Sequence, residues 1–162
     1  MGVLYVAVLG SFAIQVRAGS FPDYTPGETA AFAVLILLAI WISDIFGYFA
    51  GRAFGRHHPF PDISPGKTVA GYIGGVVGSV ALILAVAEIY AFLDRTDGIV
   101  LGILVGLGAP AGDLVESMIK RDAGVKDASQ IIPGHGGILD RFDSFLFVFP
   151  LVYVYISFVQ TV

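Results

Sequence analysis

The most constraining feature of this sequence is a series of apolar stretches separated by short polar connections. An α-helix needs about 20 apolar residues to cross the ~30 Å hydrocarbon core of a bilayer. Five candidate stretches can be drawn, over residues 3–16, 29–49, 71–93, 98–111 and 145–162. Only 14% of the residues are charged, against roughly 25% in a typical soluble domain. The sequence therefore predicts an all-α, polytopic integral membrane protein in which residues 1–162 form a single membrane-embedded domain.

Two of these stretches need comment. The first lacks a basic region before it and a convincing cleavage site after it, so we interpret it as a membrane helix rather than a signal peptide. The fourth is short unless it continues through Gly112 to Lys120 as one long helix, in which case we expect a kink at Pro110.

The basic residues are distributed unevenly among the four connections. The first and third connections carry two arginines between them, whereas the second and fourth carry seven lysines and arginines. Because basic residues accumulate in cytoplasmic loops, we expect the connections around 50–70 and 112–144 to be two cytoplasmic, motif-bearing loops. The N-terminus would then lie inside and the C-terminus outside.

Composition also limits the chemistry. The chain has no cysteine and only three scattered histidines, so a bound metal would be held by carboxylates, which favours a hard ion such as Mg²⁺. The net charge of −4 gives no indication of a nucleic-acid partner. Glycines and a serine recur at helical spacing in residues 71–79, a pattern that predicts close helix packing.

The clearest polar stripe lies in residues 112–122. Asp113, Glu116, Ser117 and Lys120 would share one face of a helix there. A polar face on a membrane helix should point to a cavity or to the interior of the bundle. The alternative for Glu116 is a simple intrahelical pair with Lys120, and the sequence leaves both open.

A glycine-rich segment, residues 133–137, precedes the last apolar stretch. Its glycines would let the backbone approach a ligand and present N–H groups to an anion. Asp140 and Asp143 follow, three residues apart. Simple stabilisation of a helix N-terminus is the alternative for both carboxylates.

These residues form one pattern: Ser117-x-x-Lys120-Arg121-x4-Lys126-Asp127, then Pro133-Gly134-His135-Gly136-Gly137-x-x-Asp140-Arg141-x-Asp143-Ser144. It closely resembles the signature of the CDP-diacylglycerol synthase (phosphatidate cytidylyltransferase) family. The resemblance covers the C-terminal part of that family, so the family's N-terminal helices are expected to be missing.

Two further segments carry the same resemblance. Residues 64–68 superficially look like a Walker A fragment but lack its glycine spacing and a preceding strand. They are more similar to the family's Ser-Pro-Lys-Lys-Thr-Trp-Glu-Gly motif, with Lys67 and Thr68 matching and departures at Gly66, Val69 and Ala70. Residues 44–52 resemble the family's Asp-x-x-Ala-Tyr-x-x-Gly-Arg segment. The alternative for Asp44 is an ion pair with Arg52 on the same helix face.

The resemblance implies transfer of a cytidylyl group from CTP to phosphatidate, giving CDP-diacylglycerol and pyrophosphate. It implies catalytic roles for Lys120, Arg121, Lys126, His135 and Arg141. It implies substrate contacts from Lys67, Thr68, Ser117, Gly134, Gly136 and Gly137. It implies Mg²⁺ ligands at Asp113 and Asp140, with Asp143 and Asp44 as secondary ligands or partners of ligands. A second cation and a homodimer are left open.

The expected location is the cell's inner or plasma membrane, with the site facing the cytoplasm. One rival hypothesis is a CTP-dependent enzyme acting on another lipid phosphate, or a lipid kinase. A different class, a small cation transporter or channel, would place the buried aspartates along a pathway. Transporters usually have internal repeats, and none is evident in the sequence.

Overall fold

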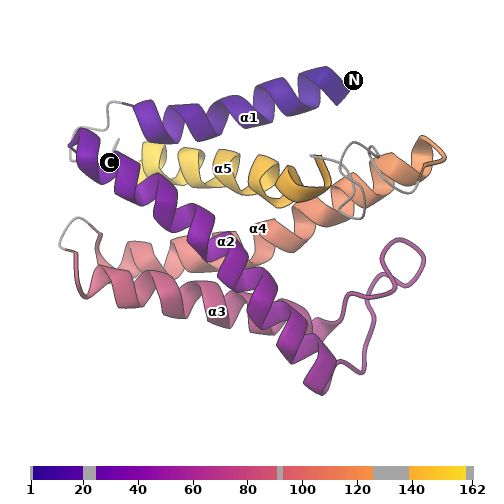
Figure 1. Ribbon diagram of the computed structural model, residues 1–162. Coiled ribbons are helices and arrows are strands. Elements are labelled where there is room, and N and C mark those ends of the chain that lie inside the picture. The colour runs from indigo at the N-terminus through magenta and orange to yellow at the C-terminus, as the bar shows by residue number, and fades with distance from the viewer. Residues whose placement is uncertain (1, 20–24, 91–92, 126–138, 160–162) are drawn as a thin grey trace.

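The protein is a bundle of α-helices (Figure 1). The structure is a computed structural model and describes residues 2–19, 25–90, 93–125 and 139–159, without the side chains of residues 2–4 and 139–141. The helices are α1 (Gly2–Ala18), α2 (Pro26–Phe54), α3 (Val69–Ala87), α4 (Arg95–Asp122) and α5 (Leu139–Val159). Helix α2 packs on α3, α3 on α4 and α4 on α5, while α1 lies along α5 and also touches α2.

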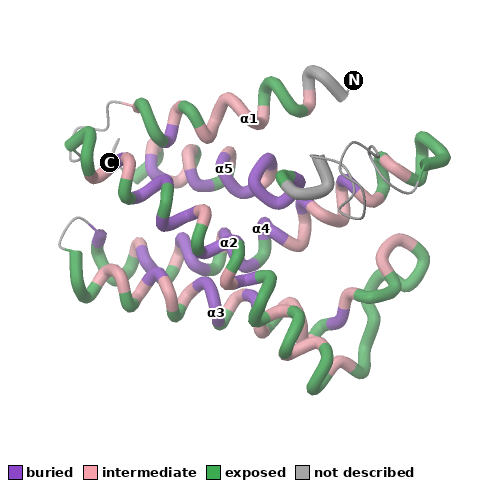
Figure 2. Tube along the Cα trace, viewed as in Figure 1, coloured by how far each residue is buried: buried purple, intermediate pink, exposed green. Residues whose placement is uncertain are grey.

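The lengths and surfaces of the helices confirm the prediction of an all-α, polytopic membrane protein. Four helices, α2 to α5, are long and apolar enough to cross a bilayer, and α1 is a shorter apolar helix of 17 residues. Large apolar side chains such as Ile14, Phe49 and Val154 point outward, with 69%, 65% and 62% of their surface exposed. The buried residues lie between the helices and the exposed ones on their outer sides (Figure 2). Such a surface suits hydrocarbon better than water.

Side-chain caps set several helix ends and correct the expected boundaries. Helix α2 begins earlier than residue 29 because Thr25 and Glu28 form a capping box. The third apolar stretch does not continue as a helix to residue 93, because α3 ends at Ala87 and Asp94 caps the start of α4. Helix α4 runs unbroken through Pro110, so the fourth stretch is the long helix that the sequence left open.

Small residues bring the central helices into close contact, as the 71–79 pattern predicted. A Cβ atom on Gly74 would lie 2.4 Å from the Cβ of Ala50 in α2. On the other side of α3, the buried Ser79 hydroxyl donates a hydrogen bond of 2.7 Å to the Gly102 carbonyl oxygen in α4. Larger side chains at this crossing would push the backbones apart.

This packing gathers the polar ends of four helices. The C-terminal ends of α2 and α4 and the N-terminal ends of α3 and α5 lie at the same end of the bundle, together with the 55–68 connection (Figure 1). The 55–68 connection therefore meets the C-terminal half of α4, although the two are far apart in the chain.

Candidate active site

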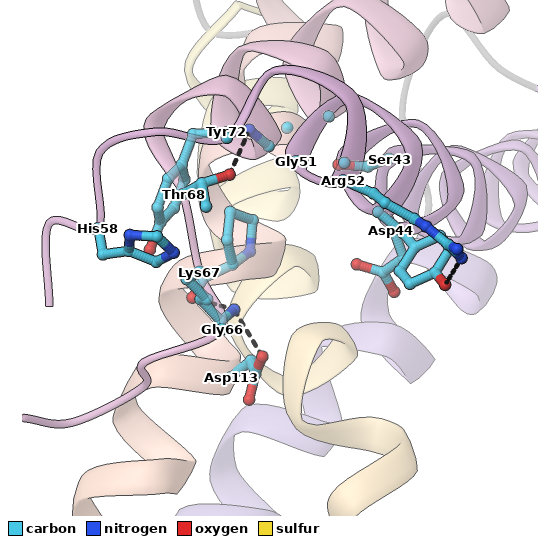
Figure 3. A pocket seen from close by; sticks show the side chains of 17 residues that line it. Ser43, Asp44, Gly51, Arg52, His58, Gly66, Lys67, Thr68, Tyr72 and Asp113 are labelled. Atoms are coloured by element: carbon cyan, nitrogen blue, oxygen red, sulfur yellow. Dashed lines mark hydrogen bonds and ion pairs between the residues drawn. The ribbon is translucent and has the colours of Figure 1, made fainter. Parts of the chain in front are cut away.

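A cavity of about 570 Å³ opens at this end of the bundle. Its walls come from α2, the 55–68 connection, the start of α3 and the middle of α4. The charged side chains that line it are Asp44, Arg52, Lys67 and Asp113, and His58, Thr68 and Tyr72 add further polar groups (Figure 3). The volume lies within the range of ~300–1,000 Å³ that is typical of small-molecule sites.

Lys67 joins the two motif regions across this cavity. Its Nζ atom lies 2.5 Å from the Oδ2 atom of Asp113 and donates a hydrogen bond of 3.2 Å to the Pro110 carbonyl oxygen (Figure 3). The Lys67 side chain is only 18% exposed, whereas that of Asp113 is 40% exposed. The ammonium group is thus fixed at the cavity wall, and the carboxylate remains accessible.

Thr68 explains how Lys67 is held in place. Its hydroxyl oxygen accepts a hydrogen bond of 3.1 Å from the Gly71 backbone N–H, which caps the start of α3. The next residue, Val69, donates its backbone N–H to the His57 carbonyl oxygen at 3.0 Å. The connection is therefore anchored on both sides of Lys67, and Thr68 has a capping role that the sequence reading missed.

The opposite wall of the cavity comes from one face of α2. Asp44, Tyr48 and Arg52 line it. The Arg52 guanidinium donates a hydrogen bond of 3.1 Å to the Tyr48 hydroxyl (Figure 3). The alternative of an Asp44–Arg52 ion pair is wrong, since none of the ion pairs among the described side chains joins these two residues.

Next to the cavity, three carboxylates from two helices converge. Ligand oxygens of Asp113, Glu116 and Asp143 all lie within 4.8 Å of one another. Glu116 is 1% exposed and Asp143 8% exposed. Their approach depends on Gly112, where a Cβ atom would lie 2.7 Å from the Asp143 carbonyl oxygen. Carboxylate oxygens are the ligands that Mg²⁺ prefers in proteins, so this residue set fits such an ion.

Glu116 satisfies both sequence hypotheses at once. Its carboxylate lies 3.5 Å from the Lys120 ammonium group, which is the intrahelical pair. It is also a member of the buried cluster with Asp113 and Asp143. The polar face predicted on residues 112–122 is confirmed as a face toward the bundle interior, and Glu116 belongs with the candidate metal ligands that the sequence reading had not included.

The remaining predicted residues fall into two groups. Ser117 lies beside the cluster, with its hydroxyl 3.5 Å from an Asp113 oxygen, and exposed Arg121 donates a hydrogen bond of 3.0 Å to the Ile63 carbonyl oxygen. Asp140 and Arg141 lie in the first turn of α5, but their side chains are outside the description. Also outside the described residues are Lys126, Gly134, His135, Gly136 and Gly137.

Two tyrosines near the carboxylates were not foreseen. The hydroxyl groups of Tyr5 and Tyr72 are buried and have no hydrogen-bond partner among the described residues. Tyr5 interacts electrostatically with Asp143 and Glu116, and Tyr72 interacts with Asp113. A tyrosine inside an apolar stretch carries no sequence signal of its own, because aromatic side chains are common in membrane helices.

The described residues form an all-helical membrane bundle with lysines, arginines and clustered carboxylates at one end, a combination whose chemistry suits phosphates and a hard cation. Sequence comparison is more specific: residues 1–159 match the cytidylyltransferase family, and the chain belongs to that family.

Individual relatives agree with this assignment. The chain is 42% identical over 156 residues to the phosphatidate cytidylyltransferase of Staphylococcus aureus (strain COL), a match that covers 94% of this chain and 55% of the relative. It is 48% identical over 124 residues to the phosphatidate cytidylyltransferase of Synechocystis sp., covering 76% of this chain and 42% of that protein. The chain thus spans about half the length of the curated relatives that it matches.

Proposed function

We propose that this chain transfers the cytidylyl group of CTP to phosphatidate, producing CDP-diacylglycerol and pyrophosphate in phospholipid biosynthesis. The observation that carries the proposal is the Lys67–Asp113 pair, which joins two motif regions in one cavity beside three clustered carboxylates. The printed names of the relatives, phosphatidate cytidylyltransferases, support the choice of substrates.

The reaction needs little covalent help from the protein. A phosphate monoester has a second pKa near 6, so phosphatidate is largely dianionic at neutral pH and one of its oxygens can attack the α-phosphorus of CTP directly. The new bond joins that oxygen to the α-phosphorus. The bond from the α-phosphorus to the bridging oxygen breaks, and pyrophosphate leaves with that electron pair.

The main obstacle is the repulsion between two polyanions. Lys67 and Arg52 line the cavity, and Lys120 lies beside the carboxylate cluster, so fixed positive charge is available where phosphates would gather. Arginine can bind two phosphate oxygens at once, whereas lysine supplies a compact charge. The role of these side chains is to hold the attacking oxygen and the α-phosphorus in line.

We propose that Asp113, Glu116 and Asp143 hold Mg²⁺, and that Asp140 contributes from the first turn of α5. A bound Mg²⁺ would neutralise phosphate charge and stabilise the charge on the departing pyrophosphate. The buried position of Glu116 and Asp143 supports this role, because carboxylates removed from water inside a membrane protein are costly without a cation partner. A second cation and a homodimer stay predictions.

We further propose that the cavity faces the cytoplasm from the inner or plasma membrane. The basic residues of the 50–70 and 112–144 segments support this orientation through the positive-inside rule. CTP would then reach the cavity from the aqueous side, and phosphatidate from the bilayer.

The test is CTP-dependent conversion of phosphatidate by the purified 162-residue chain in lipid, with Mg²⁺ or a chelator. Asp113→Asn should lower turnover by about 10²-fold or more, since it removes both a metal ligand and the partner of Lys67. The matched control is Asp122→Asn, an exposed carboxylate at the end of the same helix. Equal activity of the two variants, or turnover that ignores the chelator, would contradict the proposed site.

A further inference from the structure

A second cavity lies away from the charged one, between α1, the first half of α2 and the first half of α5. It is a groove of about 740 Å³. Its lining is apolar except at one end, where Arg17 lies, and it includes Val6, Gly10, Leu37, Phe142 and Leu146. There is space beside Gly10, because a Cβ atom there would make only an ordinary contact of 3.6 Å with Leu146.

The other end of the groove adjoins the carboxylate cluster. Phe142, which lines the groove, immediately precedes Asp143 in α5. Val6, which also lines it, follows Tyr5, whose buried hydroxyl lies close enough to Asp143 and Glu116 for their charges to act on it. Both helices that form this end therefore present an apolar side chain to the groove and a polar neighbour to the candidate active site.

The length of the groove identifies the kind of occupant. Val6 and Arg17 are eleven residues apart in α1, which corresponds to about 16 Å at 1.5 Å per residue. That is about half of the ~30 Å hydrocarbon core, counted from the carboxylate end of the groove toward the opposite membrane surface, where Arg17 lies. A single acyl chain that extends from a phosphate held at the carboxylate end has this reach.

We propose that this groove holds one acyl chain of the phosphatidate whose phosphate reacts at the carboxylate and lysine site. The choice of lipid rests on the proposed function. Moving a chain from bilayer hydrocarbon into an apolar groove gives little hydrophobic gain, because both surroundings are equally apolar. Selection for phosphatidate therefore comes from the phosphate end, and the groove fixes the position of the lipid relative to the site.

The first test uses tryptophan fluorescence. The chain has a single tryptophan, Trp41, and Trp41→Phe gives a silent background. Leu37→Trp then places a reporter in the groove, and Leu38→Trp places one a residue further on, where the native side chain is 43% exposed and does not line the groove. The two reporters lie at nearly the same depth in the bilayer, so bulk lipid affects them similarly.

The probes are phosphatidate and phosphatidylcholine with brominated acyl chains, compared at equal mole fraction in phosphatidylcholine vesicles. Brominated phosphatidate should cause the larger loss of fluorescence for Leu37→Trp, while Leu38→Trp should respond equally to both lipids. Equal responses to both lipids at both positions would overturn the proposal. Selective quenching without any turnover would leave the groove standing and refute the proposed function instead, so the two failures are distinguishable.

A second pair of variants tests the proposal independently, in case Leu37→Trp does not fold. Gly10→Leu adds a side chain that fills the groove, whereas Ala7→Leu adds the same side chain on an exposed face of α1. Gly10→Leu should reduce kcat/KM about tenfold for long-chain phosphatidate, the low end of an overpacking penalty, and less for short-chain phosphatidate. The same dependence on chain length in Gly10→Leu and Ala7→Leu would refute the acyl-chain site.

Discussion

Replacing one glycine should separate the candidate metal ligands without touching any of them. At Gly112, a Cβ atom would lie 2.7 Å from the Asp143 carbonyl oxygen, 2.9 Å from the Phe147 Cβ atom and 3.1 Å from the Ser144 Cα atom. Two of these neighbours are backbone atoms, so no side-chain rotation relieves the contact. Helix α5 has to move by about 0.7 Å to bring the first contact to the ordinary distance of 3.4 Å.

The matched control lies in the same helix. A Cβ atom on Gly98 would find its nearest neighbour, the end of the Leu84 side chain, at 3.4 Å. Both Gly→Ala changes gain similar helix propensity, about 1 kcal/mol at most, so that gain largely cancels in the comparison. The overpacking cost of about 1–3 kcal/mol applies only to Gly112→Ala. We therefore expect Gly112→Ala to be less stable than Gly98→Ala by about 1–3 kcal/mol.

Two measurements check this reasoning. Unfolding in detergent by heat or by SDS compares the stability of the two variants. The rise in unfolding temperature on adding Mg²⁺ compares their ion binding, because a ligand that binds the folded state stabilises it. Mg²⁺ requires near-ideal distances of about 2.0–2.1 Å to its ligands, so Gly112→Ala should lose most of that rise. Two variants with equal stability and equal Mg²⁺ response would refute the argument.

Further predictions concern the cluster, the helix crossing and a cap. Glu116→Gln should lower the Mg²⁺-dependent rise in unfolding temperature, whereas Lys120→Met should keep it. An equal loss of that rise in both variants would mean that only the Glu116–Lys120 ion pair matters. Ser79→Ala should cost about 1 kcal/mol of stability through the lost bond to α4, whereas Ser11→Ala should be nearly neutral; equal effects would contradict this. Backbone hydrogen bonds hold the pKa of Asp94 below its ordinary value, so its stabilisation is present above about pH 4 and lost as pH falls further. In thermal unfolding from pH 7 to pH 3, Asp94→Asn should weaken that acid sensitivity, and an unchanged profile would contradict it.

The helices could be predicted because the bilayer sets a length that the apolar stretches have to meet. Their ends could not be predicted as well, since these depend on caps. Glu28 belongs to none of the sequence motifs described above, yet its carboxylate closes the capping box that starts α2. Asp94 likewise determines where α4 begins, and residues 88–90 were wrongly placed in a helix.

The site was predictable in its residue types and only partly in its grouping. The i, i+3, i+4, i+7 spacing placed Asp113 and Glu116 on one face, which the structure confirms. No spacing could relate Lys67 to Asp113, because that contact depends on the crossings of α2, α3 and α4. The family resemblance indicated that both residues belong to the site. The packing of the bundle then brings the Lys67 Nζ atom to 2.5 Å from the Asp113 Oδ2 atom.

The positions of the charged side chains in this protein therefore depend on close helix packing at glycines. Buried carboxylates such as Glu116 and Asp143 are costly in a membrane bundle unless cations lie nearby. Lys120 reaches Glu116 within α4, but Lys67 reaches Asp113 across helices that pack closely at Gly106, and Asp143 joins the cluster across helices that pack closely at Gly112. Substituting such a glycine should reduce phosphate and metal binding even when every charged side chain is intact. A search for functional residues restricted to charged positions would miss it.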